Sequence, residues 1–167
     1  MAAGSGALSL DADRAIVMSR VFDAPRDLVF DAWTHPDHVA EWWGPAGFEN
    51  IRVDIDLKVG GAFRIYMRAP DASVHVCAGV FLEIVRPERL VYEGDAACDH
   101  PCGAGLPPKA RVTVTFEEAA GDATRLIIDT RFLTSDARVA ARAEGFSTSW
   151  LEGLERLAQH LNRTTAG

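Results

Sequence analysis

The chain has 167 residues, of which 48% are hydrophobic and 25% are charged. That length and balance fit one globular domain with a packed core of its own, and they exclude a disordered or fibrous chain. The formal net charge of -7 repels a polyanionic backbone, and the sequence shows no basic patch that would override it. We therefore expect no binding to nucleic acid.

The sequence also predicts where the protein resides and how the chain is divided. No apolar run approaches the roughly 20 residues of a membrane-spanning helix, and the first residues lack the basic and apolar regions of a secretory signal. Three cysteines without an export signal favour thiols over a disulfide framework. We expect a cytoplasmic protein without membrane insertion, with a flexible leader (1–13), a single domain (14–161) and a flexible tail (162–167).

The first third of the domain predicts a strand and two short helices. The apolar and β-branched run 14–22 is typical of a strand, and it ends at a turn before Pro25. Pro25 and Pro36 each suit the first turn of a helix, where the missing N–H costs nothing. Trp42 and Trp43 lie on the apolar stripe of the second helix.

A run of antiparallel strands follows. Phe63, Ile65 and Met67 share one face of their strand, while Ile51 belongs to a preceding strand whose apolar residues alternate with polar ones. The last two strands form a hairpin around a Gly-Asp turn. The predicted strands span residues 48–57, 62–67, 74–85, 90–93, 111–117 and 124–132.

The longest predicted element is a helix over residues 135–161. This stretch has no proline, and Ser135 is a suitable N-cap. Its apolar residues recur every three or four positions and include Phe146, Trp150 and Leu157, so one stripe must be covered by a flat apolar surface. The predicted sheet provides that surface, which gives an α+β layer arrangement.

The residues also resemble the START-like (SRPBCC) superfamily and, within it, the homologues of the activator of the heat-shock-protein-90 ATPase. The likeness spans about residues 14–161. It implies a helix-grip fold (START-like, Bet v 1-like): a curved antiparallel sheet wrapped on a long C-terminal helix, with two short helices after the first strand. The matching residues are Arg20, Phe22, Ala24, Pro25, Val29, Phe30, Ala32, Trp33, Thr34, Pro36, Trp42–Pro45, Phe48, Gly60, Gly61, Phe63, Gly79, Glu83, Ile84, Pro87–Val91, Thr113–Phe116 and Gly145–Leu157.

The resemblance further implies an internal cavity, since members bind lipids, hormones, polyketides or aromatic metabolites. We expect a carrier or sensor that holds a hydrophobic small molecule between the sheet and the C-terminal helix. The alternative is that the same side chains simply fill the core. The residues expected to contact the ligand are Trp42, Phe63, Ile65, Met67, His75, Phe81, Tyr92, Phe146 and Trp150.

Strand 74–85 is apolar on both sides, so its inward face stays open. Polarity favours the face of Val76 and Ala78, whereas the resemblance favours that of Phe81 and with it His75, which would become a polar anchor or a general base. A third reading covers both faces, one of them by a second copy in a homodimer. His35 stands where the family usually has Asp or Asn, which predicts a weaker start of the second helix or another role for this imidazole.

Two other function classes remain as alternatives. One is an enzyme of cyclase or hydrolase type that uses His75, Arg64 or Glu93 in the same cavity; the other is a partner that stimulates a chaperone ATPase. The sequence has neither a nucleophile elbow nor a phosphate-binding loop. The cluster of Cys98, His100 and Cys102 lacks the spacing of a zinc motif. We therefore expect no catalytic residues, no metal and no cofactor.

Overall fold

A computed structural model of the protein describes residues 15–94, 110–132, 134, 136, 137 and 146–166. Within this part the strands form one antiparallel sheet of order β1-β7-β6-β5-β4-β3-β2. No helix in it is long and apolar enough to span a membrane. In chain order the elements are β1 (Ala15–Phe22), α2 (Arg26–Thr34), α3 (Pro36–Trp42), β2 (Glu49–Ile55), β3 (Ala62–Arg68), β4 (Val74–Val85), β5 (Arg89–Gly94), β6 (Arg111–Ala119), η1 (Ala120–Asp122), β7 (Ala123–Arg131) and α5 (Phe146–Ala166).

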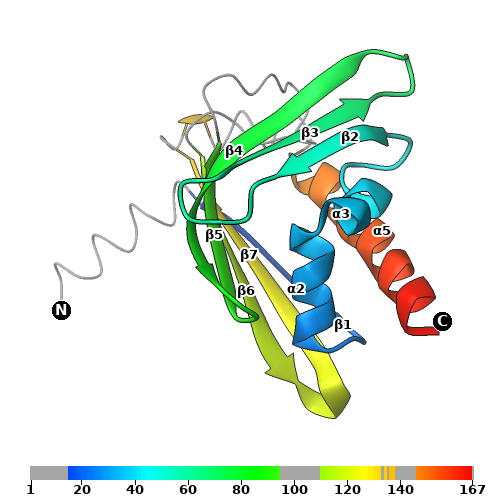
Figure 1. Ribbon diagram of the computed structural model, residues 1–167, viewed down its shortest axis with the longest axis vertical. Coiled ribbons are helices and arrows are strands. Elements are labelled where there is room, and N and C mark those ends of the chain that lie inside the picture. Colours follow the sequence, from blue (N-terminus) through cyan, green and yellow to red (C-terminus); the bar gives the residue numbers. More distant parts are fainter. Residues whose placement is uncertain (1–14, 95–109, 133, 135, 138–145, 167) are drawn as a thin grey trace, which may run out of the picture.

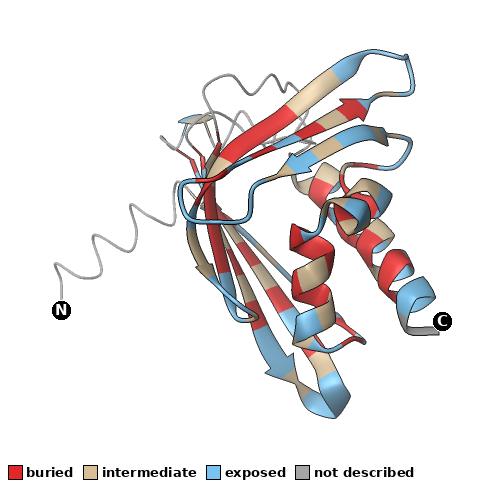
Figure 2. Ribbon diagram, in the orientation of Figure 1, coloured by how far each residue is buried: buried red, intermediate tan, exposed pale blue. Residues whose placement is uncertain are grey.

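The sheet is strongly bent, and α2, α3 and α5 lie on its concave side (Figure 1). Buried residues follow this inner side of the strands and the facing sides of the helices (Figure 2). The two short helices come directly after the first strand, and the last helix packs against α2, α3 and β1. The predicted α+β helix-grip architecture is therefore confirmed.

The C-terminal helix is longer than predicted. Its described part runs from Phe146 to Ala166, whereas the predicted end was residue 161. In its last turns Thr164 donates a hydrogen bond from its hydroxyl to the carbonyl of His160 at 2.9 Å. The predicted start at Ser135 and residues 138–145 lie outside the described residues.

The inward face of β4 is settled by burial. Cys77 and Phe81 are buried, whereas Leu82 is 38% exposed. A register shift between Phe81 and Glu83 inserts one extra residue, after which Ile84 packs on the core. On the face that polarity favoured, Ala78 is 2% exposed but lies outside the core cluster, and Val76 and Val80 are only half-buried. The preference based on polarity is therefore wrong for the central part of the strand and right for Ile84 beyond the bulge.

A second register shift explains a difference in β2. Ile51 lies between Asn50 and Arg52, where the pairing with β3 is interrupted, and it is 41% exposed. The simple alternation expected for this strand placed Ile51 inside. The bulge instead turns the Asn50 side chain inward, where its amide donates to the carbonyls of Ala40 and Trp43 at 3.1 and 2.9 Å.

The core is densely filled where α2 and α5 cover β1, β6 and β7. Phe30 of α2 and Phe116 of β6 lie 5.2 Å apart between ring centres, and both are almost fully buried. Leu126 on β7 and Leu157 on α5 are completely buried in the same core. This region is the closely packed part of the core, and the rest of the concave face lies beside it.

His35 caps α3 directly. Its Nδ1 accepts a hydrogen bond from the backbone N–H of Asp37 at 3.2 Å, in the way that an Asn or Asp side chain would. The unusual residue at this position therefore still satisfies one N–H at the helix start.

Candidate functional site

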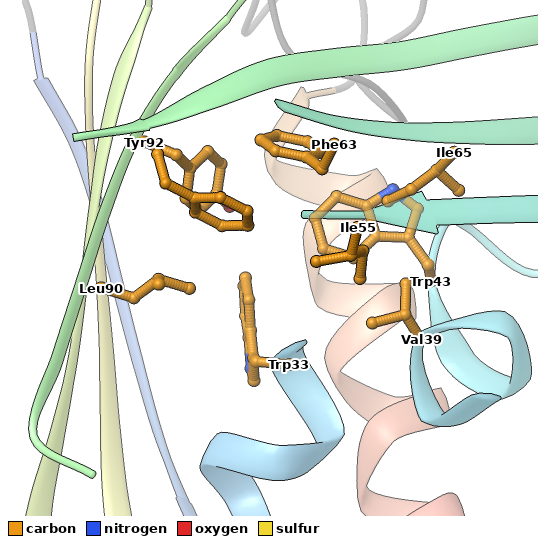
Figure 3. A pocket seen from close by; sticks show the side chains of 9 residues that line it. Trp33, Val39, Trp43, Ile55, Phe63, Ile65, Leu90 and Tyr92 are labelled. Atoms are coloured by element: carbon orange, nitrogen blue, oxygen red, sulfur yellow. The ribbon is translucent and has the colours of Figure 1, made fainter. Parts of the chain in front are cut away.

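An apolar hollow lies between the two short helices and the strands β2–β5 (Figure 3). It is bounded on one side by the ends of α2 and α3, and on the other by the concave face of the sheet. None of its described lining residues belongs to α5. The lining residues are Trp33, Val39, Trp43, Ile55, Phe63, Ile65, Phe81, Leu90 and Tyr92.

The hollow is small. Its cavity volume is about 20 Å³, which is room for about one water molecule, and the whole space counted out to the solvent is about 290 Å³. The sequence predicted a cavity between the sheet and the C-terminal helix. The tryptophan side chains occupy that space, so the remaining hollow lies further along the sheet.

Two other hollows are more spacious but are built differently. One, of about 250 Å³, is bordered by exposed polar groups, and its Arg26 is paired with Glu118 at 3.0 Å. The other, of about 210 Å³, is a groove between β1 and α5 near Val21 and Leu161. Neither is lined by a set of convergent aromatic side chains, which makes the smaller hollow the better site for an apolar molecule.

All four tryptophans of the chain meet beside the hollow. Trp33 stacks on Trp150 of α5, with ring centres 5.7 Å apart and planes 10° apart, and Trp43 meets Trp150 edge-on at 5.4 Å. Trp42 contacts both Trp33 and Trp43 and donates its indole N–H to the carbonyl of Ala32 at 2.8 Å. Trp42 thereby joins α3 to α2, and Trp150 supports the two rings that line the hollow.

The backbone after α3 aims Trp43 into the hollow. Trp43 leaves the helical conformation, with φ -61° and ψ 139°, so its side chain departs from the helix stripe. Its carbonyl accepts from Asn50 and from Arg156 at 2.9 Å each, and the same Arg156 nitrogen also donates to the carbonyls of Gly44 and Pro45. Burial lowers the pKa of Arg156 and the charge of Glu41 opposes that shift.

Three rings on the sheet form the opposite wall. Phe63 lies 5.3 Å from Phe81 and 5.2 Å from Tyr92 between ring centres. Phe63 pairs across the strands with Gly79, where an added Cβ would come within 2.7 Å of the Phe63 ring and 2.6 Å of the Glu93 carbonyl. Gly79 is therefore needed for the ring to lie flat against β4.

Tyr92 is the one lining residue with a hydroxyl. It is 3% exposed, and its hydroxyl has no hydrogen-bond partner among the described residues. Burial, with a smaller contribution from Cys77, raises the pKa of Tyr92 well above its ordinary value, so the phenol stays neutral. The Trp33 and Trp43 indole N–H groups are likewise buried and have no partner in the described chain.

The structure brings four of the predicted contact residues together in the lining of the hollow: Phe63, Ile65, Phe81 and Tyr92. Three others are buried behind or beside it, namely Trp42, Met67 and Trp150. His75 lies near the start of β4, half-buried and 3.0 Å from the Ser73 hydroxyl, and does not line the hollow. The side chain of Phe146 lies outside the described residues.

Five lining residues were not among the predicted contacts: Trp33, Val39, Trp43, Ile55 and Leu90. The sequence could have indicated Trp33 and Trp43 as lining residues, because indoles at two successive helix ends must meet if both helices cover one face. The sequence places both Trp42 and Trp43 on the apolar stripe of the second helix, and only Trp42 was among the expected contacts; in the structure Trp43 follows the end of the helix.

The polar groups considered for catalysis lie elsewhere. Arg64 is exposed on β3, and Glu93 forms an ion pair with Arg111 at 3.5 Å. No group of three His, Cys, Asp or Glu side chains in the described chain is placed to hold a metal ion. Cys98, His100 and Cys102 lie outside the described residues.

Comparisons with known proteins agree with this architecture. A family model described as "Activator of Hsp90 ATPase homolog 1-like protein" matches residues 23–162. A crystal structure of a protein from Nitrosomonas europaea superposes with a TM-score of 0.82 at 23% identity, covering 94% of this chain and 99% of that one. No curated protein matches the chain.

Two further solved structures are similar over most of the chain. A protein from Chromobacterium violaceum is 27% identical, with a TM-score of 0.69, and the match covers 87% of this chain and 95% of that one. An AHSA1-like protein from Aeromonas hydrophila is 21% identical, with a TM-score of 0.69 and coverage of 91% and 96%. These likenesses bear on the fold.

Proposed function

Because the chain belongs to the family of Activator of Hsp90 ATPase homolog 1-like proteins, whose START-like fold often serves ligand binding, we propose that it binds a small apolar molecule in the hollow lined by Trp33, Trp43, Phe63, Phe81 and Tyr92. The observation that carries this proposal is the convergence of two aromatic walls on one incompletely filled space. In the adjoining core the Phe30 and Phe116 rings lie 5.2 Å apart and both are almost fully buried.

Apolar burial would supply the binding energy. Each Å² of apolar surface removed from water contributes about 25 cal/mol, and every described lining residue is aromatic or aliphatic. A flat guest would also gain ring contacts with both walls, since their rings are already offset and tilted.

The guest must displace side chains to enter. A protein cavity of about 150 Å³ is known to take up benzene, whereas the hollow has about 20 Å³. The wall most able to yield is β2, which is an edge strand with pairing on one side only and whose Ile55 is half-buried. We therefore expect binding to move β2 and its turn, and to change the fluorescence of the tryptophans.

A cavity-blocking substitution tests the proposal. The probe is 2-isopropenylnaphthalene, titrated into the whole chain and followed by tryptophan fluorescence and calorimetry. We expect saturable binding of one probe per chain, weakened at least about tenfold in Ile55→Phe, whose larger ring fills the hollow.

Ile51→Phe is the matched control. It makes the same change on the same strand, but at an exposed bulge. We expect it to bind the probe as the wild type does. No binding to the wild type, or an equal loss in both variants, would contradict the proposal.

A further inference from the structure

We propose that the molecule bound in this hollow is a neutral carbonyl compound, whose oxygen accepts a hydrogen bond from the Tyr92 hydroxyl. The inference rests on the proposed function and adds the chemical class of the ligand. It is carried by one buried polar group that the fold aims into an otherwise apolar space.

Tyr92 is placed to offer its hydroxyl to a molecule in the hollow. Its side chain extends from β5 into the space bordered by Phe63, Leu90 and Trp33 (Figure 3). The hydroxyl is buried and has no partner among the described residues. A buried donor without a partner lowers the stability of the fold, and a ligand acceptor would remove that cost.

The described lining of the hollow has more hydrogen-bond donors than acceptors. The indole N–H groups of Trp33 and Trp43 can only donate, and the Tyr92 oxygen is the single side-chain acceptor among the described lining residues. A ligand that brings acceptors therefore fits better than one that brings only donors. A carbonyl oxygen brings two lone pairs and no hydrogen that needs a partner.

The described lining of the hollow carries no charged side chain. It includes no lysine or arginine, and the net charge of the chain is -7. A carboxylate or phosphate in the hollow would be desolvated without a counter-charge, which is far more costly than burying a neutral carbonyl. Because the pKa of Tyr92 is raised, the phenol remains a donor across the physiological range.

The test compares two probes of the same shape in the whole chain. In 2-acetylnaphthalene a carbonyl oxygen replaces the terminal CH₂ of 2-isopropenylnaphthalene. We expect the wild type to prefer the ketone by about tenfold, and Tyr92→Phe to lose that preference while still binding the alkene. Tyr66→Phe removes the other tyrosine hydroxyl of the chain, which lies on the half-exposed outer side of β3, and should keep the preference.

The infrared stretching band of the bound ketone gives a second readout that needs no variant. A hydrogen bond lowers its frequency relative to the ketone in an apolar solvent. A wild type that binds both probes equally, or a ketone preference that survives in Tyr92→Phe, would overturn the carbonyl assignment and leave the proposed function standing. Binding of neither probe to the wild type would overturn both.

Discussion

The two ends of the concave face differ in how closely their side chains pack. Under α2 and α5, the buried residues of β1, β6 and β7 are mostly aliphatic, and Leu126 and Leu157 have no exposed surface. Beneath the ends of α2 and α3, the strands β2–β5 carry rings that meet at angles and leave a gap. The first region, which includes the Phe30 and Phe116 rings, is closely packed, whereas the rings of the second region leave a small hollow between them.

The difference separates stability from binding. We expect substitutions in the filled region, called here the closed end (β1, β6, β7 and α5), to lower the free energy of unfolding only. Substitutions around the hollow, called here the open end (β2–β5 with the ends of α2 and α3), should change affinity as well.

Trp150 connects the two ends, so its removal should have the largest effect. Trp150→Ala takes away the ring that stacks on Trp33 and supports Trp43. We expect the unfolding free energy to fall by about 3 to 5 kcal/mol and binding of 2-isopropenylnaphthalene to be abolished, with the fold retained. Urea denaturation and calorimetry measure the two effects; unchanged affinity in a destabilised variant would show that this ring does not support the site.

One leucine at each end gives a matched comparison. Leu157→Ala at the closed end and Leu90→Ala at the open end should each lower the unfolding free energy by about 2 to 5 kcal/mol, because both side chains are buried. Only Leu90 lines the hollow. Its truncation enlarges the space, so we expect the naphthalene probes to bind more tightly to Leu90→Ala and unchanged to Leu157→Ala.

The comparison fails if the two leucines behave alike. Equal gains in affinity would mean that any loosened core admits the probe. A loss of affinity in Leu90→Ala would mean that the probe binds outside the hollow. Both results come from titrations at a temperature where each variant is folded by circular dichroism.

A histidine pair between α3 and α5 should give a smaller, pH-dependent effect. His38 Nδ1 and His160 Nε2 lie 2.8 Å apart. Burial lowers the pKa of His160, as do the charges of His38 and Arg163, while Glu41 raises it. The unfolded chain therefore takes up this proton more readily than the folded one, and stability should be lost as the pH falls below about 6.5.

Urea midpoints between pH 7.5 and 5.5 measure that loss. We expect His160→Gln to flatten the decline. His35→Asn is the control, since it changes an exposed histidine at the same helix while Asn still caps the helix start. A decline of the same slope in His160→Gln would assign the pH dependence to other groups.

The sequence predicts most of the frame, because strands and helices follow from periodicity and proline positions. The elements begin and end close to their predicted bounds, as with Val74–Val85, where the prediction and the structure coincide. The alternation of a regular strand puts Phe63 and Ile65 on one face, and both line the hollow.

The rest depends on tertiary contacts that spacing does not encode. The bulges at Ile51 and Leu82 reverse the alternation locally, and neither position is marked by glycine or proline. Whether Trp42 or Trp43 lines the hollow depends on where α3 ends, which Asn50 and Arg156 fix from distant elements. The small size of the hollow likewise follows from how four indoles pack, which their positions in the chain do not determine.

The most direct measurement is the set of nuclear Overhauser contacts between bound 2-isopropenylnaphthalene and the assigned side chains of the protein. The account predicts contacts with Phe63, Leu90 and Tyr92 on the sheet and with Trp33 on α2. Contacts confined to Val21, Ala158 and Leu161, in the more spacious groove between β1 and α5, would contradict it.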